Sequence, residues 1–463
     1  MAGSENSSTH FDLAIIGTGS GNSLVTPDFD DKQVAVIEAG TFGGTCLNVG
    51  CIPTKMYVYA AEVANTVRHA ERYGVDAELC GVRWKDIRDR IFGRIDPISA
   101  GGLEYRRDGA NTTLFLGHAE FTGAHSIRID TADEAVDITA EQTVIAAGGR
   151  PMIPELVTVS GVPYHTSDTI MRIDELPERL VILGGGYIGA EFAHIMSALG
   201  VQITLIARGS TLLRHLDSEI SERFTQLVAT KWDLRLGVDV VSVTGGPGEV
   251  SVTLSDGRQA TGDALLVATG RIPNTDRLGL PAAGVQMLAD GRVRTDCYGR
   301  TTVPGIWSLG DVSSDYQLKH VANHEARVVA YNLLHPDQPR AFDHRFVPSA
   351  VFTDPQIASV GCTEDELRGR DRPYRAVVQD YGDTAYGWAM EDSSGICKLI
   401  ADPTTGELLG AHLLGYQASN LIQPLIQAMS LGQRVPELAR GQYWIHPALM
   451  EVVENALLKL GLN

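Results

Sequence analysis

LVILGGGYIGAEFAHIMSALGVQITLIAR, residues 180–208, is the stretch that decides the fold. It combines an apolar strand, a glycine-rich turn, a helix and a second apolar strand. Gly184, Gly186 and Gly189 occupy the three glycine positions of a dinucleotide-binding turn. The stretch therefore predicts a βαβ unit in which the turn and the helix N-terminus hold a pyrophosphate.

A second segment, nearer the start of the chain, has the same order of features. FDLAIIGTGSGN, residues 11–22, is followed by the apolar stretch VAVIEAG. Gly17 and Gly19 fill the first two glycine positions, but Asn22 stands at the third, so we expect looser packing there. Pro27 should make the helix short. Two such units predict two bound dinucleotides and an α/β fold with two Rossmann-like domains.

The residues after each second strand distinguish the two nucleotides. Glu38 ends the strand VAVIE, where an acid accepts hydrogen bonds from the ribose diol of FAD or NAD. The second unit has no acid there, and Arg208 and Arg214 follow instead. Two guanidinium groups suit a 2′-phosphate, which favours NADPH. Two solvated surface arginines are the alternative, and Gly189 argues weakly for NADH.

GGTCLNVGCIPTKM, residues 43–56, holds two of the six cysteines in the chain. Cys46 and Cys51 can close a small disulfide loop, and such loops are easily reduced. Pro53 suits the first turn of a helix, which would place Cys51 near a helix N-terminus, where a thiolate is stabilised. This pattern favours a redox function over two reduced core cysteines.

Two further motifs contain candidate functional side chains. GIWSLGDV, residues 305–312, places Asp311 where a carboxylate could bind a hydroxyl chain or cap a helix. In QYWIHPALMEVVE, residues 442–454, His446 precedes a proline at which we expect a helix to begin, and Glu451 follows. An imidazole oriented by a carboxylate suits acid–base work on thiols. Plain structure is the alternative unless an interface brings His446 to Cys46.

The pattern of the chain predicts three domains. After about residue 348 the sequence alternates like an antiparallel sheet, with helices expected over 418–432 and 447–460. We predict an FAD-binding and central domain over 1–150 and 275–347, an NADPH-binding domain over 151–274, and a dimerisation domain over 348–463.

Composition excludes several functions. Lys and Arg number 38 against 57 Asp and Glu, so the net charge of −19 disfavours binding to nucleic acid or to anionic membranes. No apolar run approaches the roughly 18 residues that span a bilayer, and MAGSENSSTH, at the start, reads as a frayed polar tail. We expect a cytoplasmic protein with no metal site. The remaining cysteines are predicted to be core hydrophobes or idle thiols: Cys80, Cys297, Cys362 and Cys397.

Along its whole length the chain resembles the flavoprotein pyridine nucleotide-disulfide oxidoreductases. The order of FAD motif, cysteine pair, NAD(P) motif, Gly-Asp motif and terminal His-Pro helix carries the resemblance. It implies a homodimeric disulfide reductase that uses FAD and NADPH. It also implies that Cys51 is the thiolate beside the flavin, that Cys46 attacks the substrate, and that His446, held by Glu451, serves the cysteine pair of the other subunit.

The resemblance also places residues around the cofactors. It implies an ion pair between Lys55 and Glu191 near the flavin, and Tyr187 could cover the nicotinamide pocket. The predicted cofactor-binding residues are Gly17, Gly19, Ser20, Gly21, Glu38, Gly44, Thr45, Lys55, Gly148, Asp311, Gly184, Gly186, Tyr187, Ile188, Gly189, Glu191, Arg208, Arg214 and Gly270.

Members of this family differ in substrate. Pro27 stands about where glutathione reductases carry an arginine that reads a glutathione carboxylate, and Arg208 replaces the acid of NAD-dependent lipoamide dehydrogenases. The short first helix, YGDTAYGWAMED (381–392) and RGQYWIHPALMEVVENALL (440–458) resemble members that reduce mycothione, the disulfide of mycothiol. The alternatives are glutathione disulfide or lipoamide as substrate, and a regulatory flavoprotein without turnover.

Overall fold

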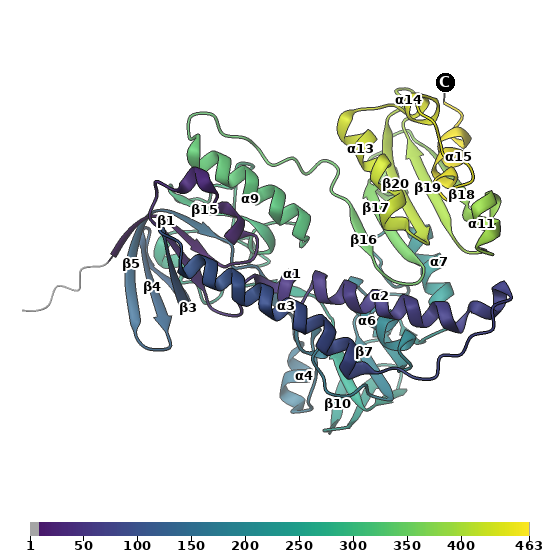
Figure 1. Cartoon of the computed structure of the whole chain (residues 1–463), viewed down its shortest axis with the longest axis horizontal. Coiled ribbons are helices and arrows are strands. Elements are labelled where there is room, and N and C mark those ends of the chain that lie inside the picture. Colours follow the sequence, from purple (N-terminus) through teal and green to yellow (C-terminus); the bar gives the residue numbers. More distant parts are fainter. Residues whose placement is uncertain (1–8, 463) are drawn as a thin grey trace, which may run out of the picture. The chain divides into compact units, whose positions relative to one another are not determined.

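The computed structural model describes residues 9–462, which divide into two compact units (Figure 1). The first unit contains the residues up to Met56, Lys85–Met152 and Arg271–Asp343. The second contains Tyr57–Trp84, Ile153–Gly270 and the residues from His344 onward. Most of the start predicted as a frayed tail lies outside the described residues, but Thr9 and His10 already belong to the first strand.

A six-stranded sheet forms the centre of the first unit. Its parallel part has the order β3-β2-β1-β5-β15, and the far halves of β3 and β5 pair with β4 in antiparallel fashion. The strands are β1 (Thr9–Ile16), β2 (Val34–Glu38), β3 (Thr112–Gly123), β4 (Ser126–Thr131), β5 (Ala135–Ile145) and β15 (Ile306–Ser308).

Apolar residues of β1 are buried on both faces of this sheet. Leu13 and Ile15 join the cluster that packs under helix α9 (Lys319–Leu334), which Figure 1 shows beside β15. Ala14 and Ile16 join the opposite cluster, which includes residues of α8 (Leu280–Ala283). Continuous apolar strands are typical of a parallel sheet covered on both faces, and the predicted α/β class is confirmed.

The prediction of a short α-helix after the first glycine-rich turn is wrong. Two 3₁₀ turns, η1 (Gly21–Leu24) and η2 (Pro27–Phe29), stand there instead. Pro27 has no N–H to donate, so an α-helix cannot pass through it with a full set of hydrogen bonds. The backbone carbonyls of Asn22 and Val25 accept hydrogen bonds from Arg106 of helix α3 (Trp84–Arg107) instead.

Arg106, near the end of α3, stabilises this irregular segment. Its guanidinium donates to the side-chain and backbone oxygens of Asn22, at 2.7 and 2.8 Å, and to the carbonyl of Val25 at 3.1 Å. Arg106 is buried, and this burial lowers its pKa. Asn22 therefore does more than loosen the packing, because it supplies two acceptors to a buried cation.

The cysteine stretch forms two consecutive helices after β2. They are α1 (Gly44–Asn48) and α2 (Cys51–Arg68), so α2 begins two residues before Pro53. A 3₁₀ turn, η3 (Ala70–Tyr73), follows.

The second unit contains the other predicted βαβ segment. Its parallel sheet has the order β13-β7-β8-β9, and α6 (Tyr187–Ala198) connects β7 to β8 as predicted. The strands are β7 (Arg179–Leu183), β8 (Gln202–Ala207), β9 (Asp233–Leu236) and β13 (Ala264–Val267). An antiparallel sheet of β10 (Val240–Gly246), β11 (Glu249–Leu254) and β12 (Gln259–Gly262) packs with it, and the remaining helices are α4 (Glu155–Ser160), α5 (Ser167–Ile170) and α7 (Ser218–Val228).

A short strand follows the last strand of each βαβ segment, β5 in the first unit and β13 in the second. The short strands are β6 (Gly149–Pro151) and β14 (Arg271–Pro273), which pair with each other in the first unit.

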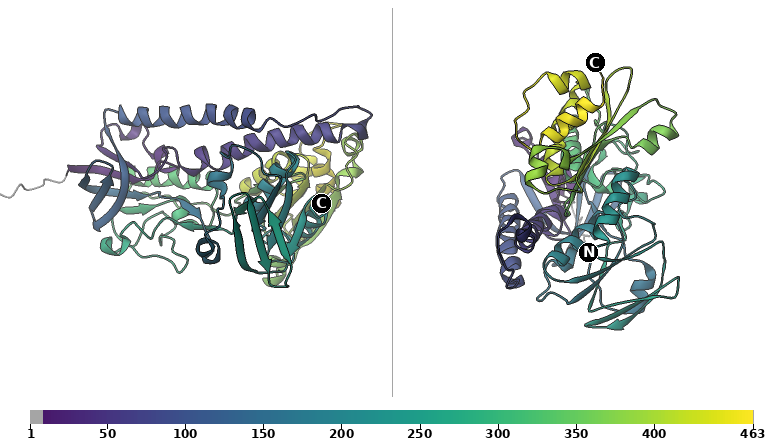
Figure 2. Two further views of the ribbon diagram at one scale, coloured as in Figure 1. Left: turned by 90° about the horizontal axis from the view of Figure 1, so that it is seen from below. Right: turned by 90° about the vertical axis from the view of Figure 1, so that its right-hand side faces the viewer.

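The C-terminal part of the second unit is a five-stranded antiparallel sheet, as predicted. Its order is β16-β17-β20-β19-β18, and α13 and α15 pack against it (Figure 2). The elements are β16 (Ser349–Val351), β17 (Gln356–Gly361), α10 (Glu364–Gly369), β18 (Arg375–Asp380), η5 (Tyr381–Asp383), α11 (Ala385–Ala389), β19 (Ile396–Ala401), β20 (Leu408–Gly415), α12 (Ala418–Leu421), α13 (Gln423–Leu431), α14 (Val435–Arg440) and α15 (Glu451–Lys459).

Two helix predictions need correction here. The helix expected over 418–432 is divided into α12 and α13, because Pro424 in the first turn of α13 cannot donate an N–H to the preceding turn. The helix expected from Pro447 begins at Glu451. Before it, the N–H of Glu451 bonds to the carbonyl of Ala448 at 3.1 Å, which is a tighter turn than an α-helix makes.

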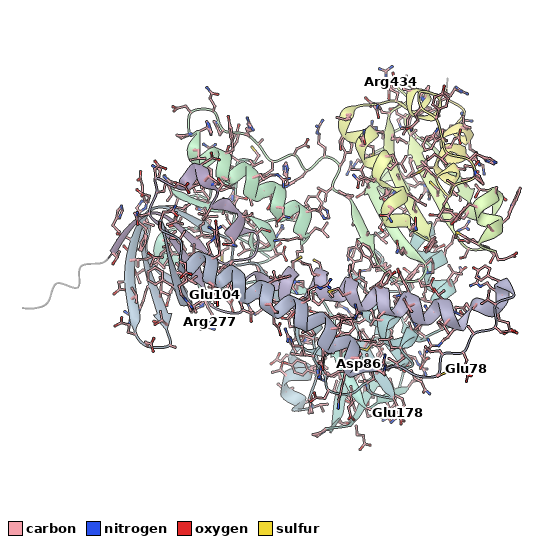
Figure 3. The ribbon with its side chains drawn as sticks, in the orientation of Figure 1. Glu78, Asp86, Glu104, Glu178, Arg277 and Arg434 are labelled. Atoms are coloured by element: carbon pink, nitrogen blue, oxygen red, sulfur yellow. The ribbon has the colours of Figure 1, made fainter. Side chains whose placement is uncertain are left out.

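Charged side chains cover the outside of the described chain. Those labelled in Figure 3 are all exposed: Glu78, Asp86, Glu104, Glu178, Arg277 and Arg434. Among residues 9–462, no helix combines the length and the apolar character that crossing a bilayer requires.

A buried ion cluster ties α7 to the C-terminal sheet within the second unit. The ammonium of Lys398 on β19, almost fully buried, lies 2.8 Å from Asp217, 2.5 Å from Glu364 and 3.3 Å from Glu219. Asp217 also accepts the N–H of Glu219 as the N-cap of α7. Burial is the largest single influence on Asp217 and opposes its ionisation. The hydrogen bond from Lys398, the charges of His412 and Lys398 and the N–H of Glu364 together outweigh it and hold the pKa of Asp217 below its usual range.

Lys398→Met should lower the free energy of unfolding by about 3–5 kcal/mol, because it leaves buried carboxylates without a compensating charge. A carboxyl whose pKa is lowered by folding stabilises above its ordinary pKa and loses this contribution as the pH falls. The deficit of the variant should therefore shrink in acid. Urea unfolding midpoints at neutral and acidic pH measure both effects.

Arg368→Met is the matched control, since Arg368 pairs with Glu364 and Asp365 with more than half of its side chain exposed. Exposed pairs contribute roughly 0–1 kcal/mol. An equal loss in the two variants would show that the buried cluster does not stabilise the unit.

Candidate active site

The two cysteines of the redox motif are in contact. Cys46 lies in α1 and Cys51 is the first residue of α2. A hydrogen bond between the two thiols, followed by burial, raises the pKa of Cys46, whereas the charge of Lys319 acts in the opposite direction. A Cβ on Gly50 would lie 2.9 Å from the carbonyl oxygen of Thr45, so only glycine allows α2 to approach α1 this closely.

The cysteine-bearing helix packs directly on the first glycine-rich turn. Gly44 has φ +70°, and a Cβ there would lie 2.7 Å from the Cα of Gly19. The N–H of Gly43 donates to the hydroxyl of Thr18 at 2.9 Å. The backbone of the turn and that of α1 are therefore neighbours, and the chain places a thiol pair beside a dinucleotide-binding turn.

The turn itself has no room for side chains at its first glycine. Gly17 has φ +105°, and a Cβ there would lie 2.4 Å from the carbonyl oxygen of Ala146 at the end of β5. A Cβ on Gly21 would meet Ala146 as well, at 2.7 Å. Gly148, with φ +66°, faces open space. This arrangement leaves bare backbone where a pyrophosphate can approach.

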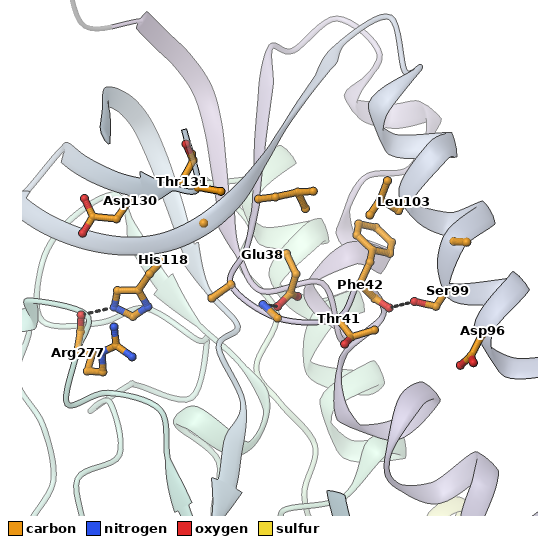
Figure 4. Close-up of a pocket in the computed structure, with 16 residues that line it drawn as sticks. Glu38, Thr41, Phe42, Asp96, Ser99, Leu103, His118, Asp130, Thr131 and Arg277 are labelled. Carbon is orange, nitrogen blue, oxygen red and sulfur yellow. Dashed lines mark hydrogen bonds between the residues drawn. The ribbon is translucent and has the colours of Figure 1, made fainter. Parts of the chain in front are cut away.

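Glu38, at the end of β2, faces a cavity of about 710 Å³ (Figure 4). One carboxylate oxygen accepts the N–H of Thr18 at 2.9 Å and its hydroxyl, and the other accepts the N–H of Gly40 at 2.8 Å. Phe42 and His118 are among the residues that line the cavity. The carboxylate is thus held by three hydrogen bonds at the edge of a space that can receive a nucleoside.

Asp311 lies in the 3₁₀ turn η4 (Gly310–Val312) of the same unit. Burial raises the pKa of Asp311, and the charges of Arg271 and Lys319 oppose this effect. Glu325 on α9 holds the turn by accepting the N–H of Gly310 and the hydroxyl of Ser314, each at 2.7 Å. No local sequence pattern indicates Glu325, because its acceptor role depends on a contact between η4 and α9.

These residues fit an FAD. Bare backbone at Gly17 and Gly19, an oriented carboxylate at Glu38 and a second carboxylate at Asp311 all belong to the first unit, as do Cys46 and Cys51. Ser20, at the end of the turn, is bonded to Lys319.

The second glycine-rich turn is tighter than the first. Gly184 has φ +118°, and a Cβ there would lie 2.1 Å from the carbonyl oxygen of Ala268. A Cβ on Gly189 would lie 2.1 Å from the carbonyl oxygen of Gly184, so α6 packs against its strand as closely as the motif requires. Gly186 precedes α6, whose first two residues are Tyr187 and Ile188, and Gly270 has φ +131°.

The loop after β8 presents the two predicted phosphate-binding arginines to solvent. Arg208 and Arg214 are exposed, and neither forms an ion pair within the described residues. The Cδ of Arg214 lies 3.7 Å from the position of a Cβ on Gly209, which follows Arg208. Leu213, with φ +54°, donates its N–H to the carbonyl of Gly185 at 2.8 Å. The loop is therefore fixed to the glycine-rich turn, and the binding of a 2′-phosphate by its two arginines stays a prediction.

The predicted ion pair between Lys55 and Glu191 stays a prediction. Lys55 belongs to the first unit and Glu191 to the second. Within its own unit, Glu191 is buried on α6 and accepts the backbone N–H of Phe352 at 3.0 Å. This contact connects the second nucleotide-binding segment to the start of the C-terminal sheet.

His446 and Glu451 are hydrogen-bonded within the second unit. The Nδ1 atom of His446 lies 2.7 Å from a carboxylate oxygen of Glu451, and the imidazole is 72% exposed. The other carboxylate oxygen of Glu451 is buried without a partner in the described part of the chain. Glu451 therefore orients the ring and leaves Nε2 directed outward, although the role of the pair stays a prediction.

Sequence models of two families cover nearly all of the described chain. The model for pyridine nucleotide-disulphide oxidoreductase matches residues 11–326, and the model for the dimerisation domain of the same proteins matches residues 347–457. The chain belongs to the pyridine nucleotide-disulphide oxidoreductase family. The predicted resemblance is confirmed.

Individual relatives extend over the whole length of the chain. Mycothione reductase of Mycobacterium tuberculosis is 58% identical over 97% of this chain and 99% of that protein. Glutathione reductase of Burkholderia cepacia is 32% identical over 95% of this chain and 97% of that protein. A solved structure of the HOCl-induced flavoprotein disulfide reductase RclA of Escherichia coli, a Cu(II) complex, is 28% identical, with a TM-score of 0.87 over 97% of this chain and 99% of that one.

Glu38→Ala should weaken FAD binding, because it removes the carboxylate that faces the cavity. Hydrogen bonds to charged groups contribute about 1.5–3 kcal/mol, so the affinity should fall roughly 10- to 150-fold. Fluorescence titration of the apoprotein with FAD measures the change. Asp130→Asn, which changes another carboxylate that lines the cavity, should leave the affinity near that of the wild type, and equal losses in the two variants would contradict the role of Glu38.

Proposed function

We propose that this chain reduces mycothione to two molecules of mycothiol with NADPH, through FAD and a redox-active Cys46–Cys51 pair. The observation that carries the proposal is 58% identity to a mycothione reductase over 97% of this chain and 99% of that protein. The contact between the two thiols beside the first glycine-rich turn supports the chemistry.

The chain's own residues account for the thiol steps. Bound FAD supplies the two-electron transfer between NADPH and the cysteine pair. Reduction by two electrons breaks the Cys46–Cys51 bond and, with one proton taken up, leaves one thiol and one thiolate. Cys46 attacks one sulfur of mycothione, which forms a mixed disulfide and releases the first mycothiol as a thiolate. Cys51 then attacks Cys46, which releases the second mycothiol and restores the enzyme disulfide.

His446 is the proposed proton donor to the leaving thiolate. Glu451 holds Nδ1 of the ring, so Nε2 can carry the transferred proton. We propose that the chain works as a homodimer in which His446 of one subunit serves the cysteine pair of the other. The match to the dimerisation-domain model and the exposed apolar side chains of Tyr443 and Ile445 next to His446 support this assembly.

Two further parts of the proposal concern organisation. We propose an FAD-binding and central domain over 1–150 and 275–347, an NADPH-binding domain over 151–274 and a dimerisation domain over 348–463. Changes of compact unit after residues 152, 270 and 343 support these boundaries. We also propose that the chain works in the cytoplasm, where the exposed thiols of Cys80 and Cys297 would stay reduced.

NADPH oxidation with mycothione, glutathione disulfide and lipoamide offered side by side tests the substrate. Mycothione should be reduced with the highest kcat/KM. Cys46→Ser, the control, should still accept hydride from NADPH but lose turnover of every disulfide, since the attacking sulfur is gone. Preference for another disulfide would overturn the substrate, and turnover by Cys46→Ser would overturn the cysteine roles.

Replacing Arg208 and Arg214 together by glutamine should raise the KM for NADPH about tenfold or more and leave that for NADH almost unchanged. The reason is the loss of charge-assisted hydrogen bonds to the 2′-phosphate. Arg235→Gln, which removes a guanidinium paired with Asp233 in the same sheet, is the control and should affect neither KM. Equal losses for the two coenzymes would remove the argument for a phosphate site.

A further inference from the structure

Lys319, the first residue of α9, has no role in the chemistry described above. Its ammonium donates to the hydroxyl of Ser20 at 2.9 Å, and this hydroxyl donates to the side-chain oxygen of Asn323 at 3.0 Å. Asn323 lies one turn further along α9. The three side chains therefore link α9 to the first glycine-rich turn and hold a positive charge at the end of that turn.

The cysteine-bearing helix packs on the same turn. The Cα of Gly19 lies next to Gly44, and Cys46 follows Gly44 by two residues. The ammonium of Lys319 is consequently near enough to Cys46 for its charge to favour the thiolate, against the opposing effects of Cys51 and burial. The same charge favours the ionised form of Asp311, which burial disfavours.

Other charged and titratable groups lie on the elements of the first unit around the cysteine pair. They are Glu38 at the end of β2, Cys51 and Lys55 on α2, Arg271 on β14, Asp311 on η4, and Lys319, His320, His324, Glu325, Arg327 and Tyr331 on α9. Both oxygens of Glu38 are engaged with Thr18 and Gly40, and Glu325 is engaged with Gly310 and Ser314.

We propose that Lys319 is a positioning residue of the thiol chemistry, whose ammonium, held by Ser20 and Asn323, stabilises the thiolate of Cys46 after the disulfide is reduced. The inference rests on the proposed roles of the cysteine pair. Two-electron reduction breaks the S–S bond and leaves negative charge on sulfur, and a neighbouring cation favours this product. A larger thiolate fraction at Cys46 speeds its attack on the substrate disulfide, because the thiolate is the nucleophile.

Alkylation of the reduced, FAD-loaded protein with iodoacetamide tests the proposal without turnover. The rate at the Cys46 peptide is followed by mass spectrometry from about pH 5 to pH 9, the range in which perturbed thiols titrate. In Lys319→Met the midpoint should rise by about one pH unit, which slows alkylation near neutral pH roughly tenfold. Lys319→Arg should restore most of the wild-type profile. Cys80 and Cys297, both exposed, are internal controls whose profiles should not move.

Two further variants complete the experiment. Asn323→Ala keeps the ammonium but removes the partner of Ser20, and it should raise the midpoint in the same direction by a smaller amount. Lys32→Met removes an equal charge from a surface pair with Asp31 and should leave the midpoint unchanged. The proposal is overturned if Lys319→Met and Asn323→Ala both keep the wild-type midpoint, or if Lys32→Met raises it as much as Lys319→Met. Failure of mycothione as a substrate would leave this result unaffected, so the two proposals are tested separately.

Discussion

The candidate site of the first unit is built around a close contact between two backbone segments, the first glycine-rich turn and the start of α1. Gly44 and Gly19 approach so closely that a single added methyl group on Gly44 would lie 2.7 Å from the neighbouring Cα. Because of this contact, the helix with Cys46 begins on the turn that would hold a dinucleotide. The thiol pair, the oriented carboxylate of Glu38 and the ammonium of Lys319 gather around it. Glycine here sets the distance between a nucleotide site and a thiol site.

Local sequence patterns were sufficient to predict much of the fold. The strand–turn–helix–strand pattern at residues 180–208 and the alternation after residue 348 each correspond to observed elements. Prediction was weaker where side chains from distant segments decide the local structure. The 3₁₀ turns after Gly21 are stabilised by Arg106, which comes from another helix. No sequence pattern around Asn22 indicates that Arg106 will be its hydrogen-bond partner.

The residues of the candidate site fall into the same two groups: those that a local motif predicts and those that only the fold brings together. Cys46, Cys51, Glu38 and Asp311 could be found because their motifs have fixed spacing. Lys319 could not, because a lysine at the start of a helix has no special meaning until the fold brings it to Ser20. Lys398 is a similar case. It sits in an apolar strand, and only the packing of α7 against the sheet supplies the carboxylates that make its burial tolerable.

The pairing of Arg106 with Asn22 also limits how the substrate preference of this scaffold can be changed. A guanidinium introduced at Pro27 would stand on a 3₁₀ turn and not on a helix face, so it would point in a direction set by the irregular backbone. In a regular helix the carbonyls of Asn22 and Val25 would bond within the helix and no longer accept from Arg106. The buried guanidinium would then lack hydrogen-bond partners, which is costly. A regular helix at this position would therefore require coordinated replacement of both segments.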